Sequence, residues 1–202
     1  MKILSTFLLM LTFGSNTIAL SAELKANQPA PQFETTDVDG KAVKLADFKG
    51  KWVVLEWFNK GCPFVQKHYN SKNMQSLQKT YTKKGVIWIT INSTNPEHKN
   101  FVTAAQAKTD AVDLGAFSTH IVMDPKGEIG NKYGAMTTPH MFVINPDQKV
   151  SYLGAIDANN SIHDKNIAST KNYVANALDQ GMEGKPIDLA YAKPYGCSVK
   201  YK

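Results

Sequence analysis

Apolar residues gather in short runs separated by longer segments of mixed polarity. The run "WVVLEWF" (52–58) is almost continuously apolar and rich in branched and aromatic residues, which is typical of a central strand covered on both faces. The run "VIWITI" (86–91) has the same character. Helical spacing of apolar residues between them predicts a helix from Pro63 to about Lys83, with a bend or break near Asn70. Strand, helix and strand together predict a parallel crossover unit.

The same patterns predict the other elements. We expect a hairpin around Asp39-Gly40, a helix over 98–108, a strand over 120–124, a turn and short helix over 125–135, a hairpin over 140–156 turning at Asn145-Pro146-Asp147, and a helix over 165–180 capped by Gly181. Residues 183–202 are rich in turn formers and predict an extended tail.

The first residues read as a secretory signal peptide. Lys2 is followed by the apolar run "ILSTFLLMLTF", which is short for a membrane span, and small residues suited to cleavage follow it near Ala22. The sequence therefore predicts a signal peptide over 1–22, a domain over 23–182 and a tail over 183–202. Export, most simply to a bacterial periplasm, would place both cysteines in an oxidising environment, and no lipid or membrane anchor is expected after cleavage.

Composition removes one class of function. The 202 residues carry a formal net charge of +6, and all 23 basic residues are lysine. The lysines are scattered and form no stripe interleaved with aromatic residues, so we interpret them as solvated surface and expect no nucleic-acid partner.

The chain has only two cysteines, and the first stands where a thiolate would be stabilised. In "EWFNKGCPF", Cys62 occupies the expected N-cap and Pro63 the first helical position. Unpaired amides and the positive end of the helix dipole then favour the thiolate, which is the nucleophile in thiol-disulfide exchange or attack on a peroxide. The alternative is a small buried residue at a turn.

Two other features bear on the same chemistry. Glu56 is the only charged residue in the apolar strand, and burial would raise its pKa, so that it could accept and donate a proton near the thiol. In "MTTPHMFVI", Pro139 stands at the entrance of a strand after Thr138, where a cis bond would bring backbone polar groups close to a substrate.

These residues resemble the thioredoxin superfamily. "VVLEWFNKGCPF" with a later Thr-Pro, the preceding hairpin and the segment before Pro139 are similar to its redoxin branch, which includes peroxiredoxins and secreted thioredoxin-like reductases. The resemblance covers about residues 28–180 and implies an α/β fold of the thioredoxin type. Its central mixed β-sheet would be flanked by helices, with an N-terminal hairpin and a redoxin-type insertion.

The resemblance also implies roles for single residues. Cys62 would be the attacking thiol, Glu56 the buried proton carrier and Pro139 the cis-proline beside the sulfur. Thr138 would offer its backbone to a peptide or disulfide, and Pro63 and Phe64 would contact the substrate too. The expected partners are a protein or small-molecule thiol or disulfide, or a peroxide, and an external thiol reductant, with no cofactor.

The departures from the family pattern matter as much. The second cysteine of the thioredoxin dithiol motif is replaced by Val65. The peroxiredoxin proline and threonine are replaced by Leu55 and Asn59, and the arginine that polarises a peroxide has no counterpart, since lysine lacks its planar fork of donors. Thiol-disulfide exchange is therefore the first hypothesis and atypical thiol peroxidase activity, with an antioxidant role, the second.

The second cysteine, in "KPYGCSVKY", leaves three readings open. Cys197 could resolve an oxidised Cys62 reversibly, form a permanent disulfide clip with it, or stay unpaired. The tail is long enough to fold back, and Gly196 would allow close approach. Two further alternatives are a non-catalytic module and a metal-binding relative, for which Gln66 stands where a second cysteine would be needed and His140, more simply a strand histidine, could approach the thiol.

Overall fold

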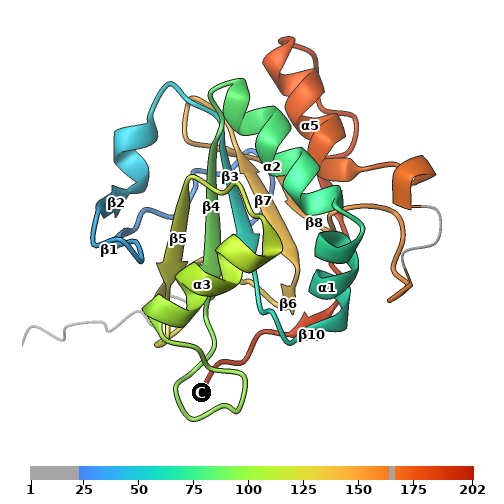
Figure 1. The fold of residues 1–202 in the computed structure, drawn as a ribbon. Helices are drawn as coiled ribbons and strands as arrows, with labels where there is room; N and C mark the ends of the chain where they lie inside the picture. Colours follow the sequence, from blue (N-terminus) through green and yellow to red (C-terminus); the bar gives the residue numbers. More distant parts are fainter. Residues whose placement is uncertain (1–22, 164–166) are drawn as a thin grey trace, which may run out of the picture.

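The structure is a computed structural model that describes residues 23–163 and 167–202. At its centre is a mixed sheet of strand order β5–β4–β3–β7–β8–β9 (Figure 1). The strands are β3 (Val53–Trp57), β4 (Ile87–Asn92), β5 (His120–Met123), β7 (His140–Ile144), β8 (Val150–Gly154) and β9 (Tyr191–Ala192). β3, β4 and β5 run parallel, whereas β7 is antiparallel to both β3 and β8. This is the mixed α/β sheet that the sequence predicted.

Two further strand pairs flank the sheet. β1 (Glu34–Thr36) and β2 (Ala42–Lys44) form the predicted hairpin, in which Gly40 adopts the positive φ of 78° that suits glycine. β6 (Thr137–Thr138) pairs antiparallel with β10 (Cys197–Ser198), so residues from the end of the tail lie beside the strand that precedes Pro139.

Side-chain alternation along β3 explains why its sequence is apolar except for Glu56. Val53, Leu55 and Trp57 point into one core, which α4 (Glu128–Tyr133), β2 and the 3-10 helix η1 (Leu45–Phe48) help to close. Val54 points into the opposite core, under α1 (Pro63–Asn70), α2 (Asn73–Lys83) and α5 (Tyr173–Met182). Helices or loops cover both faces, so every position of the strand is buried.

The predicted helix over 63–83 is two helices. The chain breaks at Ser71-Lys72, where Lys72 adopts a left-handed φ of 62°, close to the expected position at Asn70. The parallel pairing of β3 with β4 confirms the crossover unit.

Two helix predictions were displaced. The helix expected over 98–108 is α3 (Ala104–Leu114), because Thr103 caps it by accepting from the Gln106 amide at 3.2 Å. The helix expected over 165–180 begins as the 3-10 helix η2 (Ile167–Ser169) within its described part, and α5 starts only after Asn172, whose side chain accepts from Ala175 at 2.9 Å.

Gly181 was wrongly assigned as the cap of the last helix. It lies inside α5, where an added Cβ would come within 2.3 Å of the Trp52 ring. The glycine therefore allows close packing of the helix, and the helix ends at Met182.

None of the helices within 23–163 and 167–202 is both long and apolar enough to cross a bilayer. The signal peptide expected over 1–22 lies outside the described residues.

Candidate active site

Cys62 is the last residue of the loop that joins β3 to α1. It is the N-cap of α1 with an extended backbone, Pro63 follows at the first helical position, and the side chain is 2% exposed. The preceding loop is fixed by Asn59, whose side chain accepts from the Gly61 amide at 2.8 Å and donates to Thr94 Oγ1 at 2.8 Å. A short-range turn and one long-range hydrogen bond thus set the position of the sulfur.

The Thr138–Pro139 peptide bond is cis, and Thr138 meets the thiol directly. Cys62 Sγ donates to the Thr138 carbonyl oxygen at 2.9 Å. The strand that enters through Pro139, β7, is the antiparallel neighbour of β3, and this pairing brings the two segments to the same end of the sheet.

The tail brings Cys197 to the same place. Cys197 is the register partner of Thr138 in the β6–β10 pair, and both cysteines are free thiols. Gly196 makes the approach possible, since its φ is 135° and an added Cβ would lie 2.2 Å from the Thr138 carbonyl oxygen. The expected close approach beside Gly196 is therefore present, and β10 lies next to β6 (Figure 1).

The two thiols differ in acidity. Burial acts to raise the pKa of Cys62, but interactions with Cys197, with Thr138 and with the Val65 and Cys197 amides outweigh it, so the pKa is lowered. Burial, the hydrogen bond with Cys62 and the charge of Cys62 raise the pKa of Cys197 to about 11, against a lowering effect of Lys200. Cys62 is therefore the sulfur that ionises first, and Cys197 is the proton donor of the pair.

A buried polar cluster holds the tail on the N-terminal side of Cys197. We call it the Tyr195 anchor, made of Lys67, His68, Asp157 and Tyr195. The Tyr195 hydroxyl donates to Asp157 Oδ1, lies 2.9 Å from His68 Nε2 and accepts from Lys67 Nζ at 3.5 Å. Lys67, His68 and Asp157 are 3%, 0% and 2% exposed.

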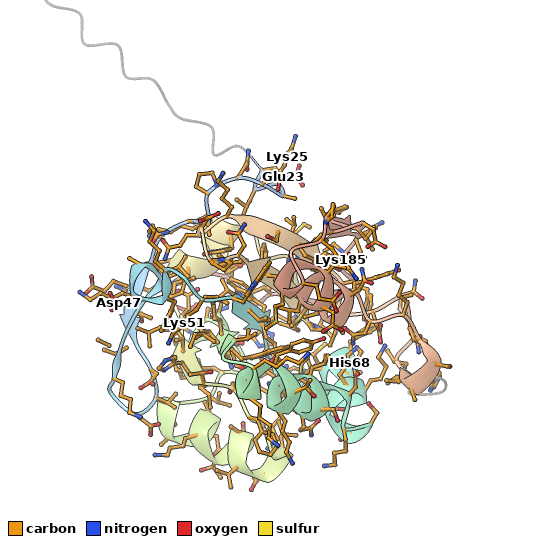
Figure 2. All side chains as sticks on the ribbon, turned by 90° about the horizontal axis from the view of Figure 1, so that it is seen from above. Glu23, Lys25, Asp47, Lys51, His68 and Lys185 are labelled. Carbon is orange, nitrogen blue, oxygen red and sulfur yellow. The ribbon has the colours of Figure 1, made fainter. Side chains whose placement is uncertain are left out.

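Figure 2 shows His68 on α1 within the body of the molecule, whereas Lys25 and Asp47 lie at its rim. Burial, and then the charge of Lys67, lower the pKa of His68 to about 3, so its ring is neutral near pH 7. Lys67 donates to the Asn159 carbonyl at 2.6 Å, which compensates the burial of its ammonium group. His68 was not among the predicted site residues, because its partner Tyr195 lies 127 residues away and no local pattern marks the contact.

A second set of contacts holds the tail on the other side of Cys197. We call it the Tyr201 anchor, made of Asn95, Ala135, Lys200 and Tyr201. The Asn95 amide donates to the Lys200 carbonyl at 2.8 Å, and the Tyr201 hydroxyl donates to the Ala135 carbonyl at 2.8 Å. Cys197 is thus fixed from both directions in the dithiol state.

Glu56 lies on β3 and is fully buried. Its carboxyl accepts from Tyr69 at 2.9 Å, Gln78 at 3.0 Å, Trp88 at 2.8 Å and Thr90 at 3.3 Å. Burial raises its pKa, although the four donors act in the opposite direction. Neither cysteine is among those donors, so any proton exchange with the thiols passes through intervening groups.

Phe64 lies near the tail, and His140 follows the cis peptide. The Phe64 ring packs 5.7 Å from that of Tyr195, so the tail partly covers it, while Pro63 is exposed. His140 is 2% exposed, accepts at Nδ1 from the Met136 amide at 3.2 Å, and its ring packs at a tilt against that of Phe142 with the centroids 4.5 Å apart, as a strand histidine would. Burial lowers its pKa to about 3.

Two adjoining cavities open beside the thiols. The smaller, about 160 Å³, is lined by both cysteines and Thr138 among others. The larger, about 330 Å³, lies between the Cys62 loop and α3. Phe58, Gly61, Lys99 and Asn100 line both. Across residues 23–163 and 167–202, no group of three or more His, Cys, Asp or Glu side chains is placed to hold a metal ion.

Comparisons with known proteins agree with this geometry. The family model described as AhpC/TSA family matches residues 26–153. Thiol-disulfide oxidoreductase ResA of Bacillus thuringiensis subsp. konkukian is 32% identical over 130 residues, which cover 63% of this chain and 68% of the relative. ResA of Bacillus subtilis is 28% identical over 141 residues, covering 69% and 72%.

Solved structures share the thioredoxin-like fold. An uncharacterized conserved protein from Geobacillus kaustophilus superposes with a TM-score of 0.75 at 29% identity, covering 88% of this chain and 92% of the other. A putative thiol:disulfide interchange protein DsbE from Chlorobium tepidum has a TM-score of 0.52 at 24% identity, covering 65% and 85%, and this likeness concerns the fold alone. The predicted fold class and the redoxin resemblance are confirmed.

Proposed function

Because the chain belongs to the AhpC/TSA family and is a thiol-dependent oxidoreductase, we propose that it catalyses thiol-disulfide exchange with Cys62 as the attacking thiol and Cys197 as the resolving thiol. One observation carries this proposal. Cys197 is the register partner of Thr138, whose carbonyl accepts the hydrogen bond of Cys62. Two thiols of opposite pKa shift therefore face each other at one helix start.

The reaction has two exchange steps. The Cys62 thiolate attacks one sulfur of a disulfide RSSR, forming Cys62–S–S–R and releasing RS⁻. Cys197, as its thiolate, then attacks the Cys62 sulfur, forming the Cys62–Cys197 disulfide and releasing a second RS⁻. Both thiolates leave as RSH once protonated, so the protein dithiol is oxidised by two electrons and RSSR is reduced. An external thiol reverses the change in the protein.

The test compares the wild type with Cys197→Ser and Cys62→Ser after addition of one equivalent of glutathione disulfide. We expect the wild type to pass to an internal Cys62–Cys197 disulfide, and Cys197→Ser to stop at a Cys62–glutathione adduct seen by peptide mass mapping. Cys62→Ser should react more slowly, because burial still raises the pKa of Cys197 when the charge of Cys62 is absent. A Cys62 that reacts no faster than free cysteine at pH 7 would refute the proposal.

Peroxide reduction is the second candidate, favoured by the match to the AhpC/TSA family. The same resolving geometry would let Cys197 condense with a sulfenic acid on Cys62 and release water. Against it, the nearby Lys60 ammonium is paired with Asp110 at 2.6 Å. One equivalent of hydrogen peroxide given to Cys197→Ser separates the candidates, since a peroxidase accumulates the sulfenic acid of Cys62 much faster than free cysteine does.

Glu56 is the proposed proton carrier. Its raised pKa supports this role, and two of its hydrogen-bond donors, Tyr69 and Thr90, line the larger cavity, which could supply the link to solvent. We expect Glu56→Gln to slow resolution of the mixed disulfide and to flatten its pH dependence, while alkylation of Cys62 by iodoacetamide keeps its rate. Unchanged resolution would leave Glu56 with a structural role only.

We also propose export of the mature chain, on the signal-like pattern of residues 1–22. N-terminal sequencing of protein recovered from the periplasmic fraction should begin near Glu23, and an intact Met1 there would refute cleavage.

A further inference from the structure

The tail uses the backbone groups that an extended polypeptide substrate would need. β10 pairs antiparallel with β6, with Cys197 opposite Thr138 and Ser198 opposite Thr137. Strand addition to an exposed edge is a common way to bind a peptide, and here this chain already occupies the edge. The Tyr195 and Tyr201 anchors hold the occupant on both sides, so an extended polypeptide would have to displace both.

Access to the thiols is instead through the cavities. Cys62 is 2% exposed, but it lines the 160 Å³ cavity together with Cys197. That volume suits the sulfur atoms and a small arm of a substrate. The 330 Å³ cavity adjoins it through the shared wall residues Phe58, Gly61, Lys99 and Asn100.

The larger cavity is predominantly apolar. Much of its lining comes from α3 and the segments on either side of it, and includes Phe101, Val102, Ala107, Ala111, Leu114 and Ile121. Asp110, which also lines it, is paired with Lys60 at 2.6 Å. Polar side chains also line it, among them Gln66, Thr90, Asn92 and Lys99. A largely apolar cavity with several polar groups is typical of a small-molecule site.

We propose that this site acts on a low-molecular-weight disulfide that carries an apolar or aromatic arm, with the arm in the 330 Å³ cavity and the sulfur atoms in the 160 Å³ cavity. The inference rests on the proposed exchange function and names its substrate class. The chemistry is the two-step exchange already given, in which the dithiol of Cys62 and Cys197 is oxidised and the small disulfide is reduced to two thiols.

The test fills the larger cavity without touching the thiols. Ala111 of α3 lines this cavity, and Ala111→Phe would place a ring in it. Ala105→Phe is the matched control, because Ala105 is an exposed residue of the same helix and does not line the cavity. Each reduced protein is mixed with dithiodipyridine, an uncharged aromatic disulfide, or with bis(hydroxyethyl) disulfide, which has small polar arms. Each rate is divided by that of glutathione with the same probe.

We expect Ala111→Phe to slow the reaction with dithiodipyridine about tenfold, the scale of discrimination by an apolar pocket. The reaction with bis(hydroxyethyl) disulfide and both reactions of Ala105→Phe should stay within twofold of the wild type. If Ala111→Phe slows the reactions with both probes, the same two rates are measured for Ala111→Leu, whose side chain is smaller. Equal slowing of both reactions in Ala111→Leu overturns the inference. So does an unchanged rate with dithiodipyridine.

Failure of the underlying function looks different. A wild-type Cys62 that reacts with neither probe faster than glutathione refutes the exchange function and, with it, this substrate class. A wild type that reacts fast with both, and whose preference is not altered by Ala111→Phe, keeps the function and refutes only the substrate class.

Discussion

The Tyr195 anchor yields the sharpest prediction, through the variant Tyr195→Phe. The substitution keeps the ring that packs on Phe64 and removes only the hydroxyl. That hydroxyl donates to Asp157 and lies 2.9 Å from His68 Nε2. Without the hydroxyl, Asp157 Oδ1 keeps the hydrogen bond that it accepts from the Asn159 amide at 3.0 Å. Asp157 Oδ2 already has no hydrogen-bond partner among the described residues.

The magnitude follows from burial. A hydrogen bond to a charged or buried partner contributes more than an exposed one, and leaving such a partner unsatisfied costs about 1–3 kcal/mol. Asp157 is 2% exposed and His68 fully buried, so we take about 2 kcal/mol for the docked tail. This corresponds to about a 30-fold larger population of tail-undocked molecules.

Hydrogen exchange measures this population directly. The Val199 amide donates to the Met136 carbonyl at 2.9 Å, and local opening of the tail exposes it. We expect its exchange to accelerate about 30-fold in Tyr195→Phe, in line with the population change, while amides of β3 and β7 keep their rates. Tyr191→Phe is the control, since Tyr191 is a tail tyrosine that is 51% exposed.

Two results would contradict the reasoning. Equal exchange of Val199 in Tyr195→Phe and the wild type would mean that the anchor does not hold the tail. Equal acceleration in β3 and β7 would mean that the hydroxyl stabilises the whole domain, and that the tail has no separate docking equilibrium.

Three further predictions concern other parts of the site. Gly196→Ala should separate β10 from β6, because the new Cβ would lie 2.2 Å from the Thr138 carbonyl oxygen, and alkylation of Cys197 should accelerate; an unchanged rate would show that the tail adapts. Burial raises the pKa of Glu56, so its contribution to stability is full below its ordinary pKa of about 4.3 and is lost as pH rises through the folded value. Urea unfolding at pH 5 and pH 8 should therefore show the wild type losing stability relative to Glu56→Gln at the higher pH. Burial lowers the pKa of His140 to about 3, so the wild type should lose about 2.5 kcal/mol relative to His140→Asn between pH 7 and pH 4.5, and parallel pH curves would count against this.

The residues near Cys62 in the sequence were sufficient to predict the part of the site that depends on local structure. The apolar run of β3, the turn through Asn59 and Gly61, and Pro63 at the first position of α1 all lie within a few residues of Cys62. Each follows from propensity and periodicity, so the placement of Cys62 at a helix start could be predicted. The position of Pro139 at a strand entrance is compatible with a cis bond, the family resemblance implies one, and the structure has it.

Long-range polar contacts could not be predicted in the same way. Tyr195 lies 38 residues from Asp157 and 127 from His68, and a lysine on a helix, such as Lys67, is ordinarily assigned to solvent. Burial of Lys67 depends on the Asn159 carbonyl, which the sequence gives no means to place. The cavities are equally inaccessible from the sequence, because their walls come from several elements.

The displaced helix α3 shows a related limit. Asn95 and His98 are turn formers that resemble helix starts, and they form turns closed by the bonds from the His98 amide to Asn95 and from the Phe101 amide to His98. Thr103, the next capping residue, starts the helix instead. Several capping residues in one polar segment compete, and packing against the sheet decides among them.

Placing the second sulfur on the tail has a consequence for the order of the two exchange steps. Part of the rise in the pKa of Cys197 comes from the charge of Cys62 and from the hydrogen bond between them, and Lys200 opposes it. Once the Cys62 sulfur is bonded to a substrate, its negative charge is gone, and burial remains as the main effect that disfavours the Cys197 thiolate. The pKa of Cys197 must then fall from about 11, so this thiol becomes a better nucleophile only after Cys62 has reacted. If Cys197 resolves the mixed disulfide of Cys62 as proposed, the two anchors hold it beside Cys62 in a weakly nucleophilic state until Cys62 has reacted.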